Sequence, residues 1–300
     1  MSKSAGEKDY PLCEFLSDLR DVRRLGTGRR YAFILGSGAS VPSDIPTGQG
    51  LVTNWVKELY LREHPKVAST EANDETIKQW ATANNLGIKD FTYERRAEFY
   101  GRVYQRRFRN DRTLGQDYLR DVMRNKRPSF GYSVLAQLVA QTEHRLVITT
   151  NFDHLLEDAL HRYMEREPLV CNHEDLAKFL YNQQAGPVIA KIHGDIQFET
   201  YNAEEDLQKL KSQWDGPLHA LLQNYIPIFI GYGGNDPGFM DFLHDVPKDT
   251  FRHGLIWTHR PNRHPQEAER ARSWWTSSAA IMSPFRALMN SCSCWVMSLN

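Results

Sequence analysis

The sequence predicts an α/β protein with a parallel sheet that is covered by helices on both faces. Two observations predict it: short apolar runs typical of buried strands, and segments with helical spacing of apolar residues that alternate with them. Such alternation is typical of parallel sheets, which bind ligands beyond the carboxyl ends of their strands. The predicted strands are Tyr31–Leu35, Arg145–Thr149, Val188–Ile192, Ile226–Ile230 and Leu255–Thr258.

Apolar stripes that recur every three or four residues predict four helices, at Leu12–Val22, Leu51–Leu59, Leu155–Tyr163 and Phe239–Leu243. Residues 62–127 are polar, helical in character and without a strand signal, so we expect a helical module inserted between the first and second strands. We expect residues 1–260 to form one domain that carries this insertion of about 62–127. Residues 261–300 contain no convincing element and are expected to be a C-terminal tail of uncertain structure.

Composition excludes several classes of protein. Lys+Arg and Asp+Glu each total 37 of the 300 residues, so no global field favours nucleic acid or an anionic membrane. The four cysteines form no CxxC pair, which argues against a zinc ribbon or a disulfide framework. The N-terminus lacks the apolar core of a signal peptide, and no apolar run approaches the roughly 18 residues of a membrane span. We therefore expect a cytoplasmic protein.

The first strand ends in the small-residue segment Gly36–Ser40, "GSGAS". Glycines allow the backbone to approach a diphosphate, and amides at a helix start carry partial positive charge. The segment differs from the dehydrogenase fingerprint, because the sixth position is Val41 and the expected acidic residue would be Glu58, on a predicted helix. It is a candidate phosphate cradle, with a plain tight turn as the alternative.

The second and third strands also end in residues that can do chemistry. Asn151 and Asp153 precede a predicted helix, where they could cap its N-terminus or point an amide and a carboxylate at a ligand. His193 ends the third strand beside Gly194. A lone histidine is more often structural, but its place on a neighbouring strand end favours a general base.

The fourth strand ends in "GYGGNDP", residues 231–237. Its three glycines would leave a flat space that suits a ribose or a purine. Asp236 and Pro237 are a natural N-cap and first residue of a helix.

The segments "GSGAS…SDIPTG", "TTNFD", "KIHGD" and "GYGGNDP" resemble, in this order, the four signature segments of the sirtuin (silent information regulator) NAD-binding fold. The resemblance covers about residues 30–50 and 145–258. It implies a Rossmann-like domain that binds NAD, with Asn151 and His193 at the reacting centre and Asp153 near the nicotinamide end. The further NAD contacts expected from it are Gly36, Ser37, Gly38, Ala39, Ser40, Thr47, Thr150, Gly231, Gly233 and Asn235.

The sequence departs from deacylating sirtuins at two points. It lacks their zinc module with paired CxxC motifs, and Thr47 stands where the family pattern has Asp after Ile-Pro. The chain looks more like bacterial sirtuin-like proteins that hydrolyse NAD, often as effectors of anti-phage defence. The expected activity is NAD glycohydrolysis to ADP-ribose and nicotinamide, with NAD as substrate and no metal. The alternatives are a non-catalytic module that senses NAD or ADP-ribose, and an NAD-dependent protein deacylase.

An enzyme that destroys NAD must be gated, and the resemblance implies a homo-oligomer or a sensor partner of the short Argonaute or HerA-type ATPase kind. Neither an Argonaute nor a Walker A site is recognisable in this sequence. Residues 101–127 hold nine Arg or Lys against three Asp. They form either a solvated helical face or a contact surface for nucleic acid or an acidic partner.

Overall fold

The computed structural model describes residues 8–9, 30–68, 72–172, 186–194, 214, 216–251, 254–259 and 281–284. The helix predicted at Leu12–Val22 lies outside these residues. Most of the predicted tail, 261–300, lies outside them as well.

The described residues form an eight-stranded sheet in the order β1-β8-β7-β6-β2-β3-β5-β4, and each neighbouring pair is parallel. The predicted α/β fold with a parallel sheet is confirmed, and each of the five predicted strands agrees with the structure to within one residue at either end. The strands are β1 Lys8–Asp9, β2 Arg30–Leu35, β3 Leu146–Thr149, β4 Leu169–Cys171, β5 Val188–Lys191, β6 Tyr225–Ile230, β7 Ile256–His259 and β8 Ile281–Pro284.

Strands β1, β4 and β8 were not predicted. β8 pairs with β7 in the register Ile256↔Ile281, so the expectation that residues 261–300 hold no regular element is wrong for these four residues. β4 is a three-residue strand that pairs with β5 alone. β4 has only three residues, and β8 ends in Ser283 and Pro284, so neither shows the longer apolar run that marks the predicted strands.

The main helices are α2 Gly48–Glu63, α3 Asp74–Asn84, α4 Tyr100–Phe108, α5 Arg112–Met123, α6 Phe130–Gln141, α7 Leu155–Met164 and α9 Pro237–Asp245. Three match predicted stripes: α2, α7 and α9. Helix α6 was not predicted, because it is apolar around most of its circumference and shows no single stripe.

Side chains of β2 alternate between two apolar clusters, as expected for a strand buried on both faces. Tyr31, Phe33 and Leu35 pack with residues of α6 and α7. Ala32 and Ile34 pack on the opposite face with residues of α9 and of the helical segment 216–222. Helices therefore cover both faces of the sheet, as predicted.

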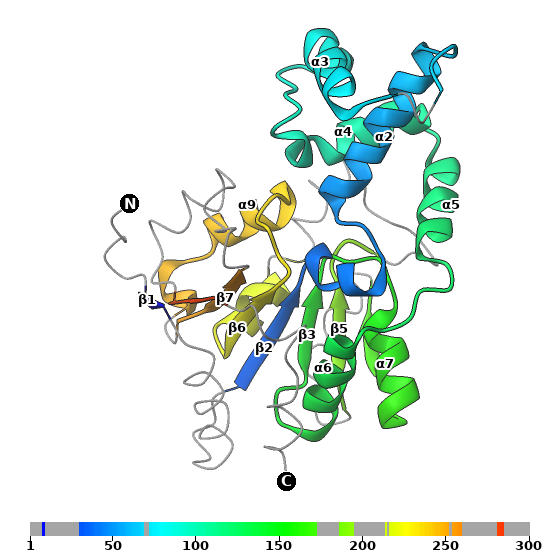
Figure 1. The fold of residues 1–300 in the computed structure, drawn as a ribbon. Coiled ribbons are helices and arrows are strands. Elements are labelled where there is room, and N and C mark those ends of the chain that lie inside the picture. The colour runs from blue at the N-terminus through cyan, green and yellow to red at the C-terminus, as the bar shows by residue number, and fades with distance from the viewer. Residues whose placement is uncertain are drawn as a thin grey trace.

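Helices α2 to α5 gather beyond the carboxyl ends of β2 and β3 (Figure 1) and have an apolar cluster of their own. The Trp55 ring lies at its centre, with four aromatic rings at centroid distances of 5.1–6.2 Å. The apolar stripe of α2 packs into this cluster, so α2 shares one core with the helical module expected at about 62–127. We refer to α2–α5 as the helical cluster.

Across the ranges that the structure describes, no helix combines the length and the apolar character needed to cross a membrane.

Candidate functional site

A cavity of about 560 Å³ lies at the carboxyl edge of the sheet, within the size range of small-molecule sites. Its walls come from the β2–α2, β3–α7 and β6–α9 loops, from His193 after β5, and from residues 97–102 of the helical cluster. The cavity therefore lies at the edge of the sheet where the sequence predicted a ligand, and residues of the helical cluster also line it.

The three predicted catalytic residues, Asn151, Asp153 and His193, all line this one cavity. Most of the predicted NAD contacts line it as well: Ser37, Gly38, Ser40, Thr47, Thr150, Gly231, Gly233 and Asn235. Gly36 and Ala39 are not in its wall, and Ala39 belongs to an apolar cluster. Asp195 of "KIHGD" lies outside the described residues.

The glycines after β2 have a role within the protein itself. The amides of Gly36 and Gly38 donate to the carbonyls of Ile230 (3.0 Å) and Gly231 (2.9 Å). A Cβ on either glycine would lie 2.7 Å from the Gly231 carbonyl oxygen. The missing side chains therefore allow the β2–α2 loop to pack against the β6–α9 loop. That these glycines line phosphates stays a prediction.

The carboxamide of Asn151 is held in one orientation. Its Nδ2 donates to the Gly36 carbonyl oxygen and to Ser40 Oγ, both at 3.1 Å, which identifies the nitrogen. The Oδ1 atom is buried, and nothing in the described part of the chain donates to it. Leaving a buried acceptor unpaired costs about 1–3 kcal/mol. Asn151 therefore does not cap a helix; it presents an acceptor suited to a ligand hydroxyl.

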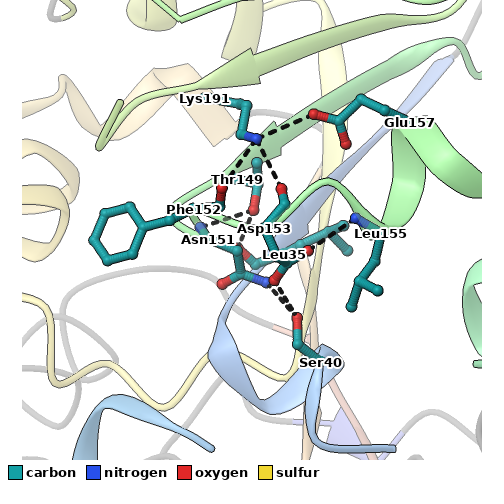
Figure 2. A network of polar contacts seen from close by, with 9 residues as sticks. All are labelled: Leu35, Ser40, Thr149, Asn151, Phe152, Asp153, Leu155, Glu157 and Lys191. Atoms are coloured by element: carbon teal, nitrogen blue, oxygen red, sulfur yellow. Dashed lines mark hydrogen bonds and ion pairs between the residues drawn. The ribbon is translucent and has the colours of Figure 1, made fainter. Parts of the chain in front are cut away.

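Asp153 is tied to the same network. Ser40 Oγ donates to Asp153 Oδ2 at 2.7 Å, and Asp153 Oδ1 accepts from the Leu155 amide at 3.1 Å, in the first turn of α7. Burial raises the pKa of the Asp153 carboxyl, and the hydrogen bond from Ser40 opposes this rise. Because the single proton of Ser40 is used here, the Tyr132 hydroxyl, 2.9 Å from Ser40 Oγ, donates to it. Figure 2 shows Ser40 between Asn151 and Asp153.

His193 faces a carboxylate. Its Nε2 lies 3.0 Å from Asp236 Oδ2, although the two atoms are not aligned as a hydrogen bond. The other oxygen of Asp236 accepts from the Phe239 amide and caps α9, as predicted. Gly194 follows His193 with φ of 82°, a conformation that favours glycine and turns the chain away after the strand.

Several residues at this site were missed by sequence reasoning. Asp236 was interpreted as a cap alone, and its contact with His193 depends on the neighbouring loops. Tyr132 comes from the unpredicted helix α6, and Glu98 and Arg102 come from the helical cluster. One signal was readable: Lys191 is a charged residue within an otherwise apolar strand.

In the described ranges, His, Cys, Asp and Glu side chains form no group of three or more that could hold a metal ion.

A search of curated proteins gives no match to this chain. Residues 145–280, however, match the family model of the SIR2-like domain. The matched range begins at β3 and contains Asn151, Asp153, His193 and Asp236, whereas β2 and the helical cluster precede it. SIR2-like proteins typically consume NAD, so the match indicates NAD-related activity. Over residues 145–280 this chain is therefore similar to the SIR2-like domain.

Proposed function

We propose that this protein is an NAD glycohydrolase that cleaves the nicotinamide–ribose bond of NAD to give ADP-ribose and nicotinamide. The observation that carries the proposal is the buried Asn151 Oδ1, which has no donor among the described residues and lies on the same cavity wall as His193. An acceptor held in place beside an imidazole suits a ribose hydroxyl or an attacking water. The SIR2-like match supports NAD as the molecule that supplies the ribose.

The residues present fit such a substrate. A cavity of about 560 Å³ is large enough for a substantial part of a dinucleotide. Its wall combines glycines and hydroxyl side chains, including Ser37 and Thr47, with one arginine, Arg102. These groups can bind sugar hydroxyls and phosphate oxygens.

In the proposed reaction, the water oxygen bonds to the anomeric carbon as the bond to nicotinamide breaks. The bonding electrons pass to the pyridinium nitrogen, so nicotinamide leaves as a neutral molecule. The water proton passes to His193 and then to solvent. A placed general base contributes roughly 10²–10⁴-fold.

The other side chains prepare this step. Asn151 Oδ1 positions the water or a ribose hydroxyl, because both hydrogens of its amide are already engaged. The Asp236 carboxylate, 3.0 Å from His193 Nε2, would stabilise the imidazolium that forms. The transition state resembles an oxocarbenium ion, whose positive charge the Asp153 carboxylate would stabilise.

The test is nicotinamide release from NAD by the purified protein, measured chromatographically. We expect His193→Ala and Asn151→Ala each to lower release by about 10²-fold or more, without a matching loss in melting temperature. His161→Ala is the matched control, because His161 is an exposed histidine on α7 outside the cavity wall.

Release at the parent rate by either active-site variant would refute the assignment. Release that requires an acylated peptide would support a deacylase instead, and NAD binding without release would support a regulatory module.

We also propose that the protein is an effector of anti-phage defence, and that oligomerisation or a sensor partner controls its NAD-cleaving activity. The motif resemblance is what supports this part. It predicts that added partner or self-association raises nicotinamide release from a low basal rate.

A further inference from the structure

A buried lysine lies directly beneath the candidate catalytic loop. Lys191 is the last residue of β5, and its side chain is 0% exposed. Its Nζ donates to the carbonyl oxygens of Phe152 (3.2 Å) and Asp153 (2.7 Å) and lies 3.1 Å from Glu157 Oε1. Figure 2 shows the ammonium pointing between these three acceptors.

A buried ammonium is costly unless it is paired and hydrogen-bonded. Glu157 supplies the opposite charge from the first turn of α7, with a side chain that is 17% exposed. Burial raises the pKa of Glu157, and the charge of Lys191 counteracts that rise. The two ions therefore depend on each other, and neither belongs to the cavity wall.

The carbonyls that Lys191 holds are those of the residues that follow Asn151. The Phe152 side chain extends in another direction and packs against the helical cluster. The loop is therefore fastened through its backbone to β5 and α7, and through one aromatic ring to the helical cluster. Asn151 directly precedes both attachments in the chain.

We propose that Lys191 and Glu157 are a positioning pair that fixes the backbone of residues 151–153 and so sets where the Asn151 acceptor meets the substrate. This inference rests on the proposed function for its kinetic consequence, but its structural content is independent of that function. Misplacing a reacting group by about 1 Å can cost roughly 10²-fold in rate. Because other loops form most of the cavity wall, we expect the loss in kcat rather than in KM.

The experiment compares Lys191→Met, Glu157→Gln and the double variant Lys191→Met/Glu157→Gln. Each single change leaves one buried charge without its partner, so the singles are expected to lose thermal stability. The double variant restores charge balance and should recover part of that stability, yet the loop remains unfastened. Recovery of stability without recovery of catalysis is the signature of a positioning role.

Two readouts are measured on the full chain: kinetics of nicotinamide release, and hydrogen–deuterium exchange of the peptide covering residues 149–155. In the double variant we expect kcat lowered by about 10–100-fold, KM changed less than about threefold, and faster exchange of this peptide. Glu58→Gln is the matched control, because it breaks the Glu58–Arg107 ion pair within the helical cluster and leaves the loop untouched.

A double variant with parental kcat and parental exchange would overturn the proposal, even if Lys191→Met alone failed to fold. If the parent protein releases no nicotinamide, the proposed function fails, and the exchange measurement still decides whether the pair fastens the loop.

Discussion

Substitution of Gly36 by alanine tests whether the glycines after β2 serve the fold or a ligand. Gly36 has φ of −109° and ψ of 175°, an extended conformation that alanine adopts without strain. The added Cβ would lie 2.7 Å from both the Gly231 carbonyl oxygen and Tyr232 Cα, inside the roughly 3.4 Å of ordinary contact. The cost is therefore steric, and it falls on backbone atoms.

The expected loss of stability has two sources: the steric overlap itself, and the hydrogen bonds that weaken when the two loops move apart. Overpacking of a close contact costs about 1–3 kcal/mol. Separating the loops also weakens the Gly36–Ile230 and Gly38–Gly231 hydrogen bonds, worth about 1 kcal/mol each. We expect a loss of about 2–4 kcal/mol in the free energy of unfolding, or roughly 3–6 °C in melting temperature for a chain of 300 residues.

Thermal and denaturant unfolding measure this loss, with Gly216→Ala as the control. A Cβ added to Gly216 would meet no atom within 4 Å, so this substitution adds a methyl group without a close contact. A Gly36→Ala protein with parental stability that had lost NAD binding would refute the steric argument and assign Gly36 to the ligand.

Two further predictions concern Asp236 and His144. Asp236→Asn keeps the cap on the Phe239 amide but removes the charge beside His193. Nicotinamide release should therefore fall by about 10²-fold while the melting temperature stays unchanged. Asp236→Ala should lower release as well, and it should also lose about 1 kcal/mol of stability because the cap is lost. Parental release by Asp236→Asn would contradict the pairing. Burial lowers the pKa of His144 to about 4, and its Nδ1 accepts from the Tyr31 amide at 3.2 Å. Below about pH 6.5 the unfolded chain therefore binds a proton that the folded chain resists, so stability should fall by up to about 3 kcal/mol as the pH drops towards 4. His144→Asn keeps an acceptor and should flatten this slope in pH-dependent unfolding, whereas an unchanged slope would show that other groups cause it.

The sheet was predictable because its central strands are buried on both faces. A run such as Tyr31–Leu35 must be apolar at every position when its side chains enter two cores, and that pattern is visible in the sequence. β8 gave no such signal, because pairing with β7 rather than its own composition makes it a strand. Helix α6 was missed because burial on most sides removes the polar face that periodicity detects.

The sequence was sufficient to predict which loops form the site. Parallel strands bring their carboxyl ends to one edge, so strand order along the chain is enough to predict that Asn151 and His193 meet there. The direction of each polar group was not predictable. Capping and ligand binding are equally good interpretations of Asn151 in the sequence, and the hydrogen bonds from its amide to Gly36 and Ser40 argue against the cap, while ligand binding stays a prediction.

The sequence by itself determined which strands are buried, which edge of the sheet carries the cavity, and which side chains reach that edge. The tertiary structure alone decided that Gly36 packs against Gly231, that Asp236 faces His193, and that Lys191 fastens the loop after Asn151. The physical reason is the distance along the chain over which each effect acts. Burial and periodicity act between neighbours along the chain, whereas hydrogen bonds and close contacts join residues that meet only when the strands are assembled.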